Sequence, residues 1–111
     1  MTGKLTTHVL DTTTGRPAAG LRIELRNLTS GGSDWVGTWT TNLDGRCDQP
    51  LLQGDSFQTG DYELNFFIGA YFGEKKFLDI VPVRFIISDT GAHYHIPLLA
   101  SPWAYTTYRG S

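Results

Sequence analysis

Three histidines supply the clearest chemistry that this sequence offers. His8, His93 and His95 all lie in stretches whose pattern predicts β-strands. An imidazole titrates at about pH 6.5, so it can accept and donate protons in neutral water. A single strand histidine is more often a hydrogen-bonded, partly buried residue than a catalytic one. His93 and His95, however, are two positions apart, so the pleat of a strand places both on the same face.

The end of the sequence carries a second group of reactive side chains. Tyr108, Arg109, Gly110 and Ser111 follow directly after residues 103–107, an aromatic and threonine-rich run that favours a half-buried strand. A terminus held in a sheet would present a phenol, a guanidinium, a hydroxyl and a carboxylate at a defined place. These groups suit the recognition of a small polar molecule.

Arg46 is the third candidate, because it follows a predicted turn. The Asp44–Gly45 pair is typical of a turn that needs positive φ, and the next side chain can be aimed from its end. The guanidinium could clamp a planar oxo or amide group through two parallel hydrogen bonds, or it could be a solvated turn arginine. Cys47 has no cysteine or metal-ligand partner nearby in the sequence and is expected to be a small buried residue.

The elements that must position these residues repeat with a period of two, which is typical of strands. The pattern predicts strands at residues 4–12, 21–26, 35–41, 61–68, 80–88, 92–100 and 104–109. Residues 70–77 are the one expected helix, residues 50–60 are undecided, and Pro82 suggests an edge strand or a bulge near the start of its strand. About seven or eight short strands separated by regular turns predict an all-β sandwich.

Composition narrows the possible functions. The chain has 111 residues, 40% hydrophobic and 18% charged, which indicates one folded domain. Its nine Lys and Arg are scattered and the net charge is −2, so nucleic acid is excluded as a partner. No apolar stretch approaches the roughly 20 residues of a membrane helix, and no N-terminal signal is apparent. A single cysteine fits a reducing compartment, which predicts the cytoplasm.

Two other interpretations of the same residues stay open. His-x-His with a third histidine is a zinc-binding pattern, in which three imidazoles and a water make a hydrolytic site. Trp35, Trp39 and Trp103, together with five tyrosines, could form a sugar-stacking platform or, more commonly, part of a core or interface. Trp35 and Trp39 are expected to share a strand face.

Five segments together resemble the transthyretin-like family, in its 5-hydroxyisourate hydrolase branch. They are residues 5–11 (LTTHVLD), 15–18 (GRPA), 41–46 (TNLDGR), 93–99 (HYHIPLL) and 105–111 (YTTYRGS). They span nearly the whole chain in the family's order. The closing Tyr-Arg-Gly-Ser distinguishes the enzymes from the hormone-binding branch, as do His8, Arg46 and His95.

The resemblance implies a fold and an assembly. The fold would be a transthyretin-like (prealbumin-like) two-sheet β-sandwich of about eight strands with one short helix, formed as a single domain over residues 1–111. The assembly would be a homotetramer, a dimer of dimers, with active sites in the channel between the dimers.

The resemblance also implies an activity. The reaction would be hydrolytic opening of 5-hydroxyisourate to 2-oxo-4-hydroxy-4-carboxy-5-ureidoimidazoline in urate (purine) degradation, without a metal or other cofactor. By motif position, the catalytic residues would be His8, Arg46, His95, Tyr108 and Ser111. The substrate-binding residues would be His8, Arg46, Tyr108, Arg109, Gly110 and Ser111.

The chemistry of these residues suggests a separate role for each in the reaction. His8 and His95 would orient and deprotonate a water, with the identity of the base left open, and Arg46 would hold the planar ring and its carbonyl groups. His93 would be a supporting or interface residue. The alternatives are a transthyretin-like carrier of an apolar ligand, to which this polar set is poorly suited, and a carbohydrate-binding sandwich, which needs exposed coplanar tryptophans.

Overall fold

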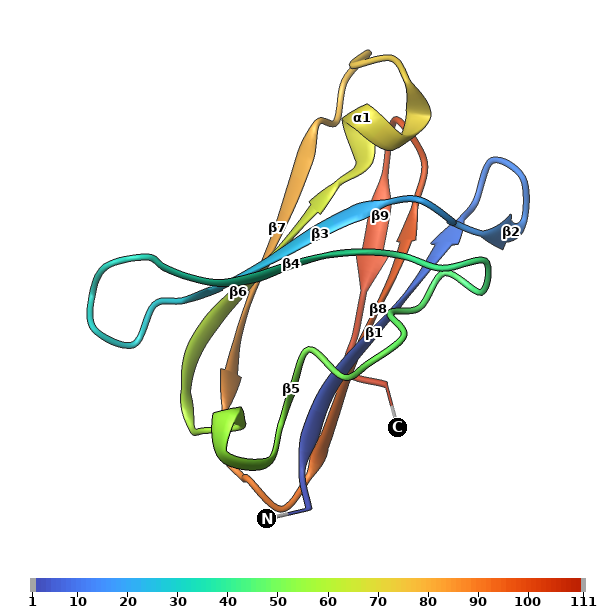
Figure 1. Cartoon of the computed structure of the whole chain (residues 1–111). Coiled ribbons are helices and arrows are strands. Elements are labelled where there is room, and N and C mark those ends of the chain that lie inside the picture. Colours follow the sequence, from blue (N-terminus) through green and yellow to red (C-terminus); the bar gives the residue numbers. More distant parts are fainter. Residues whose placement is uncertain (1, 111) are drawn as a thin grey trace.

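A computed structural model of the chain describes residues 2–110 as two β-sheets packed face to face (Figure 1). The first sheet has the strand order β2-β1-β8-β9, with β5 also paired to β1, and the second has the order β4-β3-β6-β7. The strands are β1 (Lys4–Asp11), β2 (Arg16–Pro17), β3 (Arg22–Asn27), β4 (Asp34–Thr40), β5 (Leu52–Gln53), β6 (Gly60–Phe67), β7 (Ile80–Ile87), β8 (His93–Ala100) and β9 (Tyr105–Thr107). The predicted all-β sandwich is therefore confirmed.

Alternation of side chains along the strands builds the core between the sheets. In β1, Leu5 and Val9 are buried while Thr6 and His8 are only partly covered, so the strand has an inner and an outer face. The second sheet contributes its own inward residues, among them Ile23 and Leu25 from β3 and Leu64 and Phe66 from β6. The outer face of the first sheet is thus left free for polar side chains.

Pairing of β1 with β8 is the feature of this fold that matters most for function. These two strands run parallel and in contact along their whole length, although about 90 residues separate them, with Lys4 opposite His93 and Thr6 opposite His95. Every other strand pair is antiparallel. The parallel register places the outward residues of β1 and β8 side by side.

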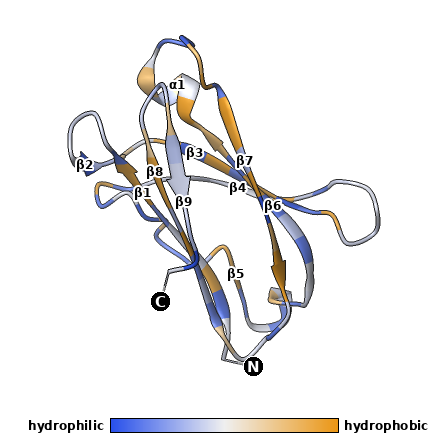
Figure 2. Ribbon diagram, turned by 180° about the vertical axis from the view of Figure 1, so that it is seen from behind, coloured by the Kyte–Doolittle hydropathy of each residue, from blue (hydrophilic) through white to orange (hydrophobic). Residues whose placement is uncertain are grey.

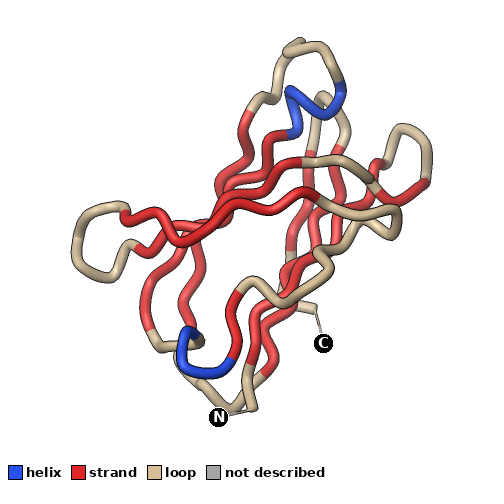
Figure 3. The backbone as a smooth tube through the Cα atoms, in the orientation of Figure 1, coloured by secondary structure: helices blue, strands red, loops and turns tan. Residues whose placement is uncertain are grey.

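Helical structure is scarce and lies two residues earlier than the sequence predicts. The helix α1 spans Ile68–Phe72, and one 3-10 turn, η1, spans Gly54–Ser56; both appear as short blue segments in Figure 3. The expectation of a helix at residues 70–77 was wrong at its end, because Gly73 takes a left-handed conformation (φ 79°) that terminates α1. Among residues 2–110, no helix is long and apolar enough to cross a membrane.

Strand β7 lies at the edge of the second sheet, as Pro82 predicts. It is the most continuously hydrophobic strand in Figure 2, and its Ile86 side chain is 65% exposed. This edge is a long apolar strand with one unpaired side.

The expectation that Trp35 and Trp39 share a face was wrong. A register shift between Leu25 and Arg26 places Trp39 opposite Ile23, on the core side, but Trp35 opposite Arg26, on the outer side. The Trp35 ring is 60% exposed, whereas Trp39 packs against the core. A coplanar pair of tryptophans for sugar stacking is therefore not formed on this strand.

Candidate active site

Two imidazoles meet at one hydroxyl on the outer face of the first sheet. The Oγ1 atom of Thr6 lies 2.6 Å from Nε2 of His93 and 2.8 Å from Nδ1 of His95. The parallel register explains this contact, because Thr6 sits opposite His95 and one pleat from His93. His93 and His95 do share a face, as their spacing predicts, and their ring centroids are 6.0 Å apart.

A tight turn over residues 42–46 brings Arg46 to the same face. The side-chain oxygen of Asn42 accepts hydrogen bonds from the backbone N–H groups of Asp44 (2.9 Å) and Arg46 (3.2 Å). Gly45 adopts φ 74°, as the predicted turn requires, and its carbonyl accepts a 2.8 Å hydrogen bond from the N–H of Val9. These bonds fix the turn against β1.

His8 is the residue of β1 that meets this turn. It forms an antiparallel bridge with Arg46, so the two backbones lie side by side. By the alternation of β1, the His8 side chain shares the outer face with Thr6. His8, Arg46 and His95, which are far apart in sequence, are therefore brought into one neighbourhood of the sheet.

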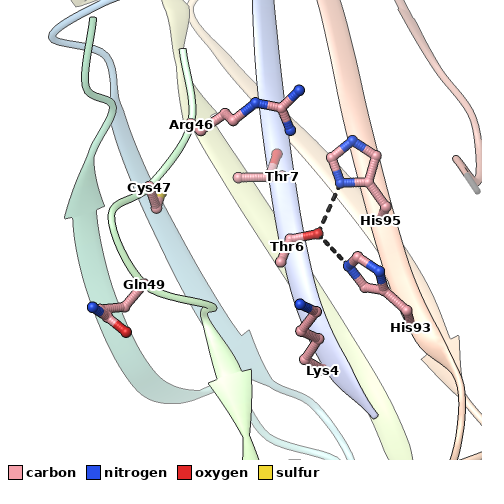
Figure 4. Close-up of a pocket in the computed structure, with 8 residues that line it drawn as sticks. All are labelled: Lys4, Thr6, Thr7, Arg46, Cys47, Gln49, His93 and His95. Carbon is pink, nitrogen blue, oxygen red and sulfur yellow. Dashed lines mark hydrogen bonds between the residues drawn. The ribbon is translucent and has the colours of Figure 1, made fainter. Parts of the chain in front are cut away.

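A cavity of about 350 Å³ opens at this place. Its lining combines two imidazoles and a guanidinium with an ammonium group, a thiol and smaller polar groups: Lys4, Thr6, Thr7, Arg46, Cys47, Gln49, His93 and His95. In Figure 4 the second ring nitrogen of His95, Nε2, points away from Thr6 on the side where the guanidinium of Arg46 lies. The cavity is polar and rich in hydrogen-bond donors.

Burial and the positive charges around the cavity lower the pKa values of its two imidazoles. Burial lowers the pKa of His95 below its ordinary value of 6.5, and the neighbouring guanidinium of Arg46 lowers it further, with smaller effects of His93 and His8. Burial and the ammonium group of Lys4 lower the pKa of His93. A neutral imidazole is the form that can act as a base.

Cys47 is half-buried in the cavity wall, close to the buried position that the sequence suggests. Burial, followed by the negative charge of Asp48, raises the pKa of the Cys47 thiol to about 11. At neutral pH the group is a thiol and not a nucleophilic thiolate.

Gly110 is the residue of the closing tetrapeptide that reaches the histidines. Its N–H donates a 2.7 Å hydrogen bond to the carbonyl oxygen of His95, and the two residues form an antiparallel bridge. A Cβ atom at position 110 would lie 2.6 Å from Cδ2 of the His95 ring. Glycine is thus required here so that the chain can pass beside the imidazole.

Tyr108 and Arg109 lie elsewhere within the chain. Both line a second cavity, of about 220 Å³, whose other walls are mostly apolar residues of β7 and β8. The guanidinium of Arg109 stacks over the ring of Tyr94, with its carbon 4.3 Å from the ring centroid. Within one chain, Tyr108 and Arg109 therefore lie apart from the histidine cavity, and Ser111 lies outside the described residues.

Sequence reasoning missed Thr6 and Lys4. Both precede His8 at spacings of two and four residues, so the period of two already places them on its face. Their contact with the histidines of β8 depends on strand pairing, for which the sequence carries no local signal. Among residues 2–110, no three side chains of His, Cys, Asp or Glu are grouped to hold a metal ion, so the three-histidine zinc site is not assembled.

Known proteins resemble this chain over nearly its whole length. Residues 5–110 match the HIUase/Transthyretin family. A curated relative, 5-hydroxyisourate hydrolase 2 of Rhizobium meliloti, is 52% identical over 98% of this chain and 97% of its own length.

Solved structures give the same picture of the fold. A crystal structure of (S)-allantoin synthase superimposes with a TM-score of 0.92 and 47% identity over 98% of this chain, which spans only 44% of that longer chain. Sea bream transthyretin, solved in complex with thyroxine, superimposes with a TM-score of 0.88 and 28% identity over 96% of this chain and 94% of its own. The fold is therefore shared by proteins described as an enzyme and as a thyroxine complex, so the fold alone does not fix the function.

Proposed function

This chain belongs to the HIUase/transthyretin family, and from that premise we propose that it is a hydrolase acting on 5-hydroxyisourate. The reaction opens the ring to 2-oxo-4-hydroxy-4-carboxy-5-ureidoimidazoline, a step of urate degradation. Curated relatives at about half identity carry this enzyme's name and match in length. The family match over residues 5–110 supports a single domain covering the chain.

The observation that carries this proposal is the polar cavity between β1, β8 and the Arg46 turn. A cyclic amide is hydrolysed when a water is activated, the ring is held, and the developing oxyanion is stabilised. The cavity places two neutral imidazoles and one guanidinium around a volume of about 350 Å³. These are the groups that the three tasks require.

His95 is proposed to supply the base. Its Nε2 atom points away from Thr6 on the Arg46 side of the cavity, and its lowered pKa keeps the ring unprotonated at neutral pH. General base assistance from such a group contributes roughly 10²–10⁴-fold to the rate. His8, beside Arg46 on the same face, is proposed to orient the water.

Arg46 is proposed to hold the planar substrate and its oxyanion. The guanidinium offers donors in a fixed plane, which matches the carbonyl groups of a urate-like ring. Removing one such donor from a developing oxyanion typically costs about 3–4 kcal/mol of transition-state stabilisation. The turn bonds from Asn42 and Gly45 hold the backbone that carries this side chain.

The remaining site residues are proposed to act in an assembly. We propose a homotetramer in which sites lie in the channel between dimers, and in which Tyr108, Arg109 and Ser111 contact substrate together with Gly110. This proposal would reconcile the separate position of Tyr108 and Arg109 within one chain with a role at the site. The single thiol, Cys47, supports the further proposal that the enzyme works in the reducing cytoplasm.

The polar lining also separates this function from that of a carrier. A carrier of an apolar ligand would need a cavity lined mainly by hydrophobic side chains. Here the lining includes Lys4, Arg46 and two histidines, which would each lose hydration against an apolar ligand.

The decisive experiment generates 5-hydroxyisourate from urate in solution and follows its ultraviolet absorbance with and without this protein. The expected result is a decay much faster than the spontaneous one, in proportion to enzyme concentration. A decay rate independent of the protein would refute the proposed activity.

A further inference from the structure

The Thr6 hydroxyl has one hydrogen but two imidazole partners. It lies 2.6 Å from Nε2 of His93 and 2.8 Å from Nδ1 of His95, both within hydrogen-bond distance. A hydroxyl donates one hydrogen bond, and a neutral imidazole has one N–H and one acceptor nitrogen. Thr6 can therefore donate to only one ring, and the other ring must donate to Thr6.

Only two arrangements of protons satisfy both bonds when the rings are neutral. In the first, Nδ1–H of His95 donates to Thr6 and Thr6 donates to Nε2 of His93. In the second, Nε2–H of His93 donates to Thr6 and Thr6 donates to Nδ1 of His95. The tautomer of one ring thus dictates the tautomer of the other.

The surroundings of His95 favour the first arrangement. In it, Nε2 of His95 carries a lone pair toward the side of the guanidinium of Arg46, whereas the second arrangement would point an N–H dipole at that positive charge. The other charged or titratable groups near the two rings, among the described residues, are Lys4, His8, Arg46 and the neutral thiol of Cys47. None of them is an anion that would favour an N–H at Nε2.

We propose that Thr6 and His93 form a proton relay that sets the tautomer of His95 and stores the proton which His95 takes from water. This inference rests on the proposed hydrolase function. Thr6 and His93 are positioning residues in it, because neither needs to touch the substrate.

The relay balances over one reaction cycle. Nε2 of His95 removes a proton from water as the oxygen bonds to the substrate carbonyl carbon. The Nδ1 proton of His95 passes to Thr6 while the Thr6 proton passes to Nε2 of His93, leaving His95 neutral with an Nε2–H. That proton then goes to the leaving nitrogen as the carbon–nitrogen bond breaks, and the transfers through Thr6 reverse. His93 returns to its neutral form.

The relay has a clear electrostatic advantage. A positive charge left on His95 would face the guanidinium of Arg46, which already lowers the pKa of that ring. Burial and Lys4 also lower the pKa of His93, but His93 is more exposed to solvent than His95, so the charge is better hydrated there while the intermediate lasts.

The test begins without substrate, with ¹⁵N-labelled histidine and NMR of the ring nitrogens above the pH at which the rings titrate. In the unmodified protein, His95 is expected to carry its proton on Nδ1. Thr6→Val removes the hydroxyl at nearly constant volume and should move the proton population toward Nε2, whereas Thr6→Ser should restore the original pattern. His8 serves as the internal control and should not change.

Measurements of kcat and KM distinguish the effect of Thr6 on the tautomer of His95 from the role of His93 in receiving the proton. In His93→Gln, the amide oxygen can still accept from Thr6, so His95 should keep its Nδ1 proton while kcat falls about tenfold or more because no basic group receives the proton. Thr6→Val should lower kcat similarly with little change in KM, and Thr6→Ser should retain most of it. His93 is exposed, so its replacement is a sound second variant should Thr6→Val fail to fold.

Two results would contradict the proposed relay, and a third would separate it from the proposed hydrolase function. Identical ring-nitrogen signals for His95 in the unmodified protein and Thr6→Val would overturn the tautomer coupling, and full activity of His93→Gln would overturn the relay. If the unmodified protein fails to hydrolyse 5-hydroxyisourate while the tautomer shift appears, the proposed function fails and the coupling stands.

Discussion

Gly110 packs against the imidazole of His95 so closely that no side chain fits between them. The N–H of Gly110 binds the carbonyl of His95 at 2.7 Å, and an added Cβ would come within 2.6 Å of the ring carbon Cδ2. The segment that follows β9 therefore holds the His95 ring, the proposed base, in place through Gly110, a contact that we call the brace. This contact gives a physical reason for glycine in the closing tetrapeptide.

Gly110→Ala should displace the His95 ring and lower kcat by about tenfold or more. The reason is that a displaced imidazole contributes less to the rate as a general base. Steady-state hydrolysis of 5-hydroxyisourate measures the effect. Gly32→Ala is the matched control, since a Cβ there meets only a side-chain atom at 3.8 Å. Equal activity of the two variants would remove the brace from the mechanism.

His95→Ala should leave the sandwich folded and lower kcat by about 10² or more, because the general base is lost. His95 is only partly buried, so its truncation creates little cavity. Turnover should be measured together with circular dichroism and gel filtration. Near-normal turnover in a folded protein would exclude His95 as the base.

Activity should persist into mildly acidic solution, because the pKa of His95 is lowered below 6.5 and the neutral ring is the active form. The rate should fall only as the pH drops through that lowered pKa. Arg46→Gln removes the neighbouring positive charge, so the pKa of His95 should rise and the acid limb of kcat should move to higher pH. The substitution should also raise KM, because Arg46 is proposed to hold the substrate. The pH profiles of kcat for both proteins measure this shift, and an acid limb moving to lower pH would contradict the assignment.

Gly45→Ala should destabilise the protein more than Gly15→Ala does. Both glycines have similar positive φ values (74° and 72°), so each substitution carries the left-handed penalty of about 1–2 kcal/mol. Only at Gly45 would the new Cβ also collide, at 2.4 Å, with the carbonyl oxygen of Val9. Urea unfolding of the two variants isolates that clash. Activity should also fall in Gly45→Ala alone, because the Arg46 turn is displaced, and equal losses in both variants would refute this account.

Prolonged treatment with EDTA should leave the hydrolysis rate unchanged, since the proposed chemistry uses imidazole and guanidinium groups. No ligand cluster of three suitable side chains occurs among residues 2–110. Rates measured before chelation, after chelation and after addition of Zn²⁺ test this expectation. A loss that Zn²⁺ restores would revive the three-histidine zinc interpretation.

Local sequence determined the strands, the turn before Arg46 and the shared face of His93 and His95. These features depend on neighbouring residues: a period of two gives the two faces of a strand, and Gly45 permits the positive φ that the turn needs. The end of α1 depends on a single residue, because the left-handed conformation of Gly73 stops the helix before residue 77.

Residue types and spacing pointed to His8, Arg46 and His95, and the family resemblance gave them catalytic roles, but only the tertiary structure decided how they meet. The register of β1 against β8 is set by packing between segments about 90 residues apart, which no local pattern encodes. That register makes Thr6 the shared partner of two imidazoles. The same non-local packing places Arg109 over the ring of Tyr94 in the second cavity, while its neighbour Gly110 bonds to His95.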